Sequence, residues 1–248
     1  MKMELMLGPV NSAYFGGGMK TKSDFIDEYY NKYFDNLCNS GVQGLGSSYI
    51  HKQIEKFWIK SNPSEILEVG VGDGSHFKYA KFARKLSVKL TALDIRSPKK
   101  AFSELVLGDR KLSIDWVTGS VEKIPLDNDS FDRVTSTCLL HHVDDPYAAM
   151  LEMRRVTRTS GEISIGLPTD PGILNRFIKK IYTYKKAKKL GVEHPAFIYS
   201  LDHQNHIFGL IEIAKYVFRN DELRIRYLPF RWMSSNLNLV VVLSVTKK

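Results

Sequence analysis

The sequence has only two cysteines and no uninterrupted apolar run long enough to cross a bilayer. Cys38 and Cys138 lie a hundred positions apart and do not make a disulfide scaffold, so a reducing compartment fits best. The longest apolar stretch, residues 237–245, is interrupted by polar residues and is too short for a membrane span. Residues 1–20 lack the basic start and the apolar run of a signal peptide. We therefore expect a cytoplasmic protein with no integral membrane segment.

Acidic residues are scarce in this chain, since 27 Asp and Glu stand against 36 Lys and Arg and give a net charge of +9. The imbalance is concentrated in residues 171–192, which contain no acid. This segment carries seven basic residues: Arg176, Lys179, Lys180, Lys185, Lys186, Lys188 and Lys189. Its apolar spacing predicts a helix over residues 173–190. The charge indicates either a solvated helix face or a surface that meets an acidic acceptor, a membrane or RNA.

Glycine is concentrated in residues 65–75, E-I-L-E-V-G-V-G-D-G-S, which predict a buried strand that runs into a glycine-rich turn. A helix is expected next, over residues 76–86. Glycines permit backbone angles that a Cβ forbids and let a ligand sit against the main chain. The turn ends at a helix N-terminus, which favours an anionic or polar ligand. Asp94 ends the next predicted strand, residues 88–93, at the distance expected of an acid that binds a ribose.

The spacing of these glycines excludes the G-x-G-x-x-G fingerprint of dinucleotide-binding proteins, because Ser75 stands where the third glycine should be. The run E-V-G-V-G-D-G instead resembles the first motif of class I S-adenosylmethionine (SAM)-dependent methyltransferases. In that family the loop holds the amino-acid end of SAM, and the acid after the second strand holds its ribose. The alternative is a strand–helix turn with incidental glycines.

A second resemblance lies in residues 119–134, G-S-V-E-K-I-P-L-D-N-D-S-F-D-R-V, which follow a predicted strand at 114–118. Many small-molecule members of the family carry G-D-A-E-x-L-P-F-x-x-x-S-F-D here. Ser120 replaces the usual acid, which in the family often contacts the adenine amino group. The resemblance implies SAM as cofactor, with S-adenosylhomocysteine (SAH) as product. The cofactor-binding residues that it implies are Glu68, Gly70, Gly72, Gly74, Asp94, Ile95, Ser120, Val121 and Leu139.

Candidates for catalysis come from the histidines. The predicted strand at residues 133–140 runs into H-H-V-D-D-P, similar to the L-H-H-V of the family, at the sheet edge where ligands of open α/β sheets bind. Displacement at a sulfonium methyl needs chiefly alignment, whereas an alcohol acceptor also needs a base. We select His142 first, then His141, with His203 and His206 next because they lie in a predicted lid. Each could instead be a packing histidine. His203 and His206 lack further metal ligands at suitable spacing, so no metal site is expected.

The element pattern predicts one α/β methyltransferase domain over residues 1–248. We divide it into an N-terminal helical cap (1–62), a SAM-binding core (63–168), an inserted basic lid (169–206), and a core helix with C-terminal strands (207–248). The fold class expected is a Rossmann-like, seven-stranded, mostly parallel sheet with helices on both faces. Residues 222–230 and 237–245 would form the C-terminal antiparallel hairpin that completes such sheets in the family.

The acceptor is less well specified by the sequence. The insertion and the terminal N-L-N-L-V look similar to methyltransferases of bacterial surface-polysaccharide pathways. This resemblance implies O-methylation of a sugar or another small polar acceptor by in-line transfer, with the basic helix facing an anionic group such as a phosphate. Two alternatives stay open. One is an RNA methyltransferase that uses residues 176–189 on the RNA backbone, and the other is a non-catalytic SAM-binding protein. The oligomeric state is not predicted.

Overall fold

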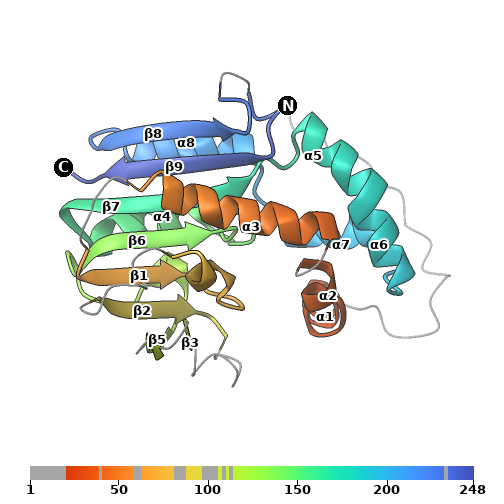
Figure 1. Ribbon diagram of the computed structural model, residues 1–248, viewed down its shortest axis with the longest axis horizontal. Helices are drawn as coiled ribbons and strands as arrows, with labels where there is room; N and C mark the ends of the chain where they lie inside the picture. The colour runs from red at the N-terminus through yellow and green to blue at the C-terminus, as the bar shows by residue number, and fades with distance from the viewer. Residues whose placement is uncertain are drawn as a thin grey trace, which may run out of the picture.

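The core of the molecule is a seven-stranded sheet with the strand order β5-β2-β1-β6-β7-β9-β8 (Figure 1). The computed structural model describes residues 21–38, 41–58, 63–80, 88–96, 106–107, 110–111, 114–231 and 234–248. The strands of the sheet are Glu65–Val69 (β1), Lys89–Asp94 (β2), Ile114–Thr118 (β5), Phe131–Thr137 (β6), Thr157–Pro168 (β7), Glu222–Leu228 (β8) and Val240–Thr246 (β9). Val106–Leu107 (β3) and Arg110–Lys111 (β4) form a separate antiparallel pair.

Strand directions confirm the predicted fold class. β5, β2, β1, β6 and β7 pair in parallel, whereas β9 is antiparallel to both β7 and β8. The central strands are buried along almost their whole length: four of the five residues of β1 and six of the seven residues of β6 are buried. This pattern is typical of parallel strands that are covered on both faces.

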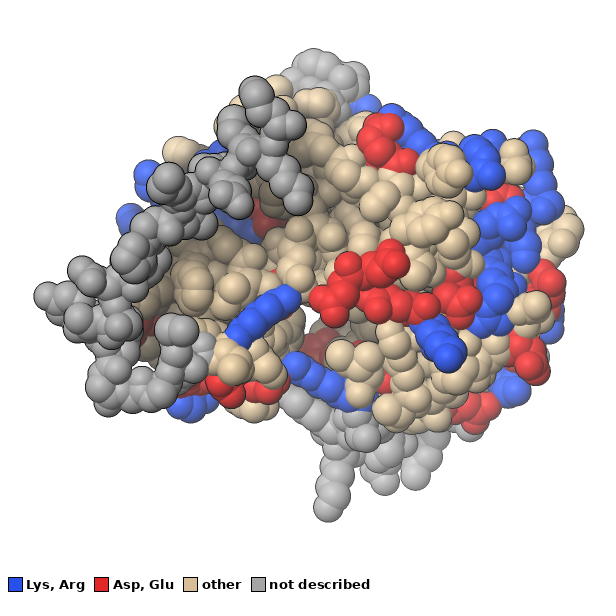
Figure 2. Space-filling model, turned by 180° about the vertical axis from the view of Figure 1, so that it is seen from behind, with Lys and Arg blue, Asp and Glu red and all other residues tan. Residues whose placement is uncertain are grey.

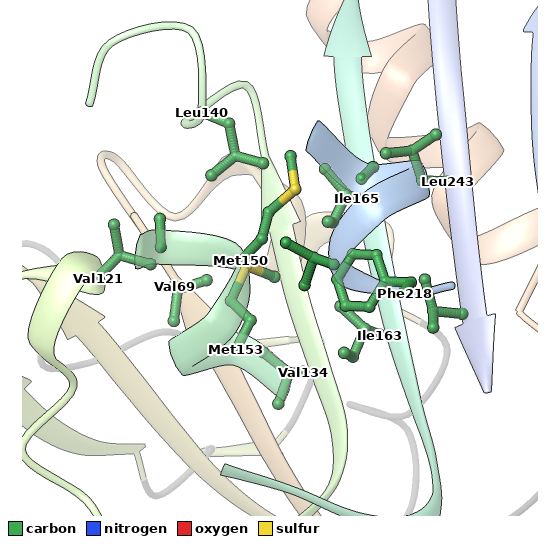
Figure 3. Packing of buried hydrophobic residues seen from close by; sticks show 14 of the residues in the cluster. Val69, Val121, Val134, Leu140, Met150, Met153, Ile163, Ile165, Phe218 and Leu243 are labelled. Atoms are coloured by element: carbon green, nitrogen blue, oxygen red, sulfur yellow. The ribbon is translucent and has the colours of Figure 1, made fainter. Parts of the chain in front are cut away.

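Helices cover the two faces of the sheet (Figure 1). Gly41–Lys56 (α3) lies on one face, and Pro146–Val156 (α4) and Ile207–Val217 (α8) lie on the other. α3 packs so closely on β7 that a Cβ at Gly166 would lie 2.5 Å from a carbon of Ile54. On the opposite face, Met150 and Met153 of α4 pack against Val134, Ile163 and Leu243 of the strands (Figure 3).

The remaining helices gather beyond the carboxyl ends of the parallel strands (Figure 1). They are Lys22–Tyr29 (α1), Asp35–Cys38 (α2), Ile173–Ile178 (α5), Tyr184–Lys189 (α6) and Pro195–Asp202 (α7). Two π-helical turns, Tyr30–Phe34 and Lys179–Thr183, join α1 to α2 and α5 to α6. Tyr29 and Leu37 pack with Ala187, Val192 and Ile198 in one apolar cluster. The predicted cap and lid therefore share a core on the ligand side of the sheet.

A buried ionic network ties α3 to the sheet and to the glycine-rich turn. Glu55 of α3 lies 2.8 Å from Arg133 of β6 and 3.3 Å from His76. The other imidazole nitrogen of His76 lies 2.8 Å from Glu68 of β1. Burial opposes protonation of His76, but Glu68 and Glu55 outweigh it and raise its pKa to about 9. His76 is therefore a cation at neutral pH, and together with Arg133 it balances the two buried carboxylates of Glu55 and Glu68.

Local structure differs from the predictions in two places. The expected helix over residues 76–86 begins as a short 3-10 turn, Ser75–Lys78, and residues 81–87 lie outside the described part of the chain. The expected strand at 133–140 ends at Thr137, because Cys138 adopts a positive φ of 54° and turns the chain out of the sheet. Across the described residues, we find no helix with the length and apolar character needed to traverse a bilayer.

Candidate active site

Four parallel strands end at one cleft of about 270 Å³. Gly70 follows β1, Asp94 ends β2, Ser120 lies just after β5, and Leu139 lies just after β6. β1 and β6 are neighbours in the sheet although four strands separate them in sequence, so the cleft lies where the strand order reverses. This is the place where open α/β sheets bind ligands. The cleft is lined by Gly70, Leu93, Asp94, Ile95, Gly119, Ser120, Val121, Glu122, Leu139, His142, Val143 and Asp144.

The glycine-rich turn needs its glycines for two different reasons. Gly70, Gly72 and Gly74 all have positive φ, at 69°, 56° and 68°. A Cβ on Gly70 would also lie 2.7 Å from both terminal carbons of Leu139, whereas a Cβ on Gly72 would meet no atom within 4 Å. Gly70 therefore lets the main chain and Leu139 share the cleft wall, and Gly72 serves the turn through its backbone angles.

Asp94 is held by the same turn that it faces. One carboxylate oxygen accepts the Gly72 N–H at 2.9 Å, and the other accepts the Arg96 N–H at 3.0 Å. A carboxylate offers about four lone-pair sites, so each oxygen can accept another hydrogen bond. Asp94 is thus oriented by the backbone and still has capacity for the two hydroxyls of a ribose.

Ser120 has a structural role as well as a position in the cleft. Its hydroxyl oxygen accepts the Glu122 N–H at 3.1 Å and caps the short 3-10 turn Val121–Lys123. Glu122 in turn accepts the N–H groups of Asp144 and Asp145, each at 2.9 Å. These bonds join the loop after β5 to the loop after β6. The Ser120 O–H can still donate to a ligand, because its acceptor role uses only a lone pair.

Six of the nine predicted cofactor residues line this cleft: Gly70, Asp94, Ile95, Ser120, Val121 and Leu139. The structure does not place Glu68 there, since Glu68 is only 1% exposed and pairs with His76. Gly72 and Gly74 shape the turn without lining the cleft. The prediction missed five lining residues: Leu93, Gly119, Glu122, Val143 and Asp144. Gly119 and Glu122 belong to the second motif, so that motif could have revealed them.

Three histidines meet at one end of the cleft. The ring centroid of His142, which lines the cleft, lies 3.9 Å from that of His141 and 5.0 Å from that of His203. The rings of His141 and His203 are 4.5 Å apart. His206, which was predicted to act with them, is exposed at the N-terminus of α8 and does not belong to this cluster. We call His141, His142 and His203 the histidine cluster.

Carboxylates hold two rings of the histidine cluster by the Nδ1 atom. The Nδ1 of His142 lies 3.0 Å from a carboxylate oxygen of Asp202, and the Nδ1 of His203 lies 2.9 Å from Asp170. Lys179 pairs with the same oxygen of Asp170. These contacts fix both rings and leave each Nε2 available to a ligand or a proton, because the carboxylate selects the Nδ1–H tautomer.

Burial disfavours protonation of two rings of the histidine cluster, those of His141 and His203. It lowers the pKa of His141 well below the usual range and lowers that of His203 to about 4, although Asp170 opposes the second shift. Burial would raise the pKa of the Asp202 carboxyl, but its hydrogen bonds and its electrostatic interaction with the neighbouring histidines outweigh burial and lower it. At neutral pH, His141 and His203 are therefore neutral imidazoles beside an ionised carboxylate.

The basic segment 173–190 is a helical run that faces two ways. Lys179, at the start of its π-helical turn, points inward to Asp170 and His203. Lys186 donates to the backbone carbonyl oxygen of Asn36 at 2.7 Å. The other five basic residues are exposed: Arg176, Lys180, Lys185, Lys188 and Lys189. Most of the basic side chains of this segment therefore face solvent, whereas Lys179 contributes its charge to the surroundings of the histidine cluster.

Acidic and basic side chains both occur on the face of the molecule that is turned away from the viewer in Figure 1. In the part of that face not covered by grey atoms, acidic side chains group near the middle and basic ones lie mainly toward one edge (Figure 2). The cleft itself carries three carboxylates, those of Asp94, Glu122 and Asp144. This side of the molecule thus offers RNA no broad basic surface over the described residues seen in the view.

Comparisons with known proteins agree with this geometry. Residues 67–165 match the model of a methyltransferase domain. The chain is 25% identical over 134 residues to demethylmenaquinone methyltransferase of Thermotoga maritima, covering 54% of this chain and 56% of that protein. It is 30% identical over 125 residues to putative methyltransferase YrhH of Bacillus subtilis, covering 49% of this chain and 67% of that protein. The chain spans about half the length of the first curated relatives that it matches.

A solved structure shares the fold at low sequence identity. The plantazolicin methyltransferase BpumL in complex with SAH aligns with a TM-score of 0.65 at 12% identity, over 92% of this chain and 95% of that one. A likeness at this identity speaks for the fold alone. The strand order, the glycine-rich turn with Asp94, the domain match and the similarity to YrhH agree with one another. The chain therefore belongs to the class I SAM-dependent methyltransferases, whose cofactor is S-adenosylmethionine.

Proposed function

We propose that this chain transfers the methyl group of SAM to a small-molecule acceptor whose hydroxyl is deprotonated by His142. The observation that carries this proposal is the position of His142, which lines the cofactor cleft and is held on its far side by Asp202. SAM, when bound, supplies an activated sulfonium methyl. The chain would hold it with the Gly70 turn, the carboxylate of Asp94 and the loop around Ser120.

The hydrogen bond between His142 and Asp202 prepares the ring for proton transfer. With Nδ1–H directed to the carboxylate, the lone pair of Nε2 is free. The acceptor hydroxyl would give its proton to Nε2 as its oxygen takes the methyl group, whose bond to the sulfonium sulfur breaks. If an adjacent carbon of an enol or phenol took the methyl group instead, that carbon would then lose its own hydrogen as a proton and the oxygen would be protonated again. Asp202 stabilises the imidazolium that results, and Tyr30 steadies Asp202 through a hydrogen bond of 3.2 Å.

The acceptor that we favour is a sugar or another small polar molecule. Support comes from the polar surroundings of the histidine cluster, where Asp170, Lys179, Asp202 and Tyr30 come together. A hydroxylated ring is the second candidate, because several relatives carry the name demethylmenaquinone or ubiquinone/menaquinone methyltransferase. A base at His142 would serve both acceptors, since a phenolic hydroxyl must also lose its proton before its ring carbon is methylated.

Transfer of labelled methyl from SAM into fractionated cell extract would test the proposal, with His142→Gln as the matched variant. We expect label in a small-molecule or lipid pool with the wild-type chain, and strongly reduced label with the variant. Nuclear magnetic resonance of the purified product would distinguish an O-methyl from a C-methyl group. Label that ribonuclease removes would overturn the choice of acceptor. Binding of SAM without transfer to any pool would support the non-catalytic alternative.

A further inference from the structure

We infer that the histidine cluster is a binding site for a divalent transition metal ion, with Zn²⁺ the ion that it fits best. His141, His142 and His203 each offer one ring nitrogen, and these three atoms all lie within 4.8 Å of one another. They come from the loop after β6 and from the end of α7, two segments about sixty residues apart in sequence. The expectation of no metal site rested on the spacing of His203 and His206 alone, and that spacing does not reveal the approach of His203 to His141 and His142.

His141 gives the second, independent observation. Its side chain is 96% buried, being only 4% exposed, and its Nδ1 has no hydrogen-bond partner. Buried polar atoms without partners are rare, because the loss of water contacts is not compensated. The ring of His141 lies against both His142 and His203, and one of its nitrogens lies within 4.8 Å of the ligand atoms of both. A metal ion shared with the other two rings would give His141 a partner.

Surrounding carboxylates are arranged as they are around metal-bound histidines. Asp170 holds the Nδ1 of His203, which leaves Nε2 on the side of Asp202, 3.9 Å from its carboxylate. Metal-bound histidines commonly donate their other N–H to a carboxylate, which fixes the ring and raises its basicity. Asp202 holds the Nδ1 of His142 in the same way, which leaves the Nε2 of that ring to a metal ion and the fourth coordination position to water or another small ligand.

The charge of the surroundings suits a dication. Lys179 brings one positive charge, and Asp170 neutralises it through their ion pair. Asp202 adds a second carboxylate, which lies beside both His142 and His203. The described groups that face the cluster therefore carry no net positive charge that would repel a metal ion.

Ligand chemistry and geometry select the ion. Three imidazole nitrogens suit zinc, cobalt, nickel or copper, whereas magnesium and calcium prefer oxygen ligands. With Zn–N distances of about 2.0–2.1 Å, tetrahedral coordination places ligand nitrogens about 3.4 Å apart. The three nitrogens, now up to 4.8 Å apart, would need only small ring rotations to reach that spacing.

Occupation by zinc would have a consequence at the active site, and this part of the inference rests on the proposed function. When a metal ion is bound to the Nε2 of His142, that nitrogen has no lone pair left to accept a proton. His142 therefore cannot act as a base while it binds a metal ion. We therefore expect Zn²⁺ to inhibit methyl transfer while leaving the cleft around Gly70 and Asp94 open to SAM.

Equilibrium dialysis of the full chain against Zn²⁺, with the metal counted by mass spectrometry, tests the site directly. We expect one ion per chain, and binding at least tenfold weaker in His141→Asn and His203→Asn. His194→Asn is the matched control, because His194 is exposed and lies outside the cluster. The absorption spectrum of the wild-type chain with Co²⁺ needs no variant, and strong tetrahedral bands are expected. Weak octahedral bands, or zinc binding equal in His203→Asn and the control, would overturn the site.

Two further readouts separate the metal site from the proposed function. Titration of Zn²⁺ into a transfer assay should abolish turnover at one equivalent, and the dissociation constant for SAM should stay within twofold. Stoichiometric zinc with unchanged turnover would overturn the inhibition and leave the site standing. Absence of transfer both with and without a chelator would overturn the proposed function, whereas the metal count would be unaffected.

Discussion

Substitution of Gly70 by alanine tests how the glycine-rich turn and Leu139 share the cofactor cleft. Gly70 has a φ of 69°, where an L-residue costs about 1–2 kcal/mol. The new Cβ would also lie 2.7 Å from two carbons of Leu139, closer than non-bonded carbons approach. The side chain of Leu139 must therefore move, and Leu139 lines the cleft. We expect Gly70→Ala to weaken SAM binding by at least about tenfold, which corresponds to about 1.4 kcal/mol.

Gly72→Ala is the matched control for this substitution. Gly72 has a similar φ of 56°, but its Cβ would meet no atom within 4 Å. Gly72→Ala should lose about 1–2 kcal/mol of unfolding free energy in urea titrations through its backbone strain alone, and Gly70→Ala should lose at least as much. Isothermal titration calorimetry with SAM should show the larger loss of affinity for Gly70→Ala. Adding Leu139→Ala should restore part of it, because the clashing carbons are removed. Equal affinities of the two single variants would refute the reasoning.

Three further predictions concern the base and the buried ionic network. His142→Gln should lower turnover by about 10²–10⁴-fold at saturating SAM with little change in SAM affinity; unchanged turnover would remove its role as base. Arg133→Leu leaves two buried carboxylates, Glu55 and Glu68, facing the single charge of His76, and should cost about 3–5 kcal/mol in urea unfolding; a loss below about 1 kcal/mol would contradict this. The raised pKa of His76 predicts stability that is complete below pH 6.5 and falls as the pH rises through about 9. His76→Gln should flatten that slope, and stability that increases over this window would be inconsistent with a charged His76.

The sequence predicts those parts of the site that are formed by residues close together in the chain. The glycines at 70, 72 and 74 fix a turn through their own backbone angles, and Asp94 ends the strand beside it. Parallel strands bring their carboxyl ends to one edge, so the motifs after each strand meet there by topology. The fold class could be predicted for the same reason, from strands that alternate with helices and a final apolar pair.

Contacts between distant segments could not be predicted in this way. His203 joins His141 only because α7 folds back over the sheet edge, and no local spacing encodes that approach. Lys179 looked like one more exposed cation of a basic helix, but its π-helical turn lies where the side chain reaches Asp170. Glu68 belongs to the first motif and still faces His76, because a single strand residue can point to either side of the sheet.

The measurement that tests the central claim most directly is calorimetric titration of SAM into the wild-type chain and into Asp94→Ala. Asp94 is the cleft carboxylate that the turn holds by the Gly72 N–H, and hydrogen bonds to a charged group contribute about 1.5–3 kcal/mol. We predict one SAM per wild-type chain and a dissociation constant about 10- to 100-fold higher for a folded Asp94→Ala. Absence of SAM binding to the wild-type chain, or equal dissociation constants for the two, would contradict the assignment of this cleft to SAM.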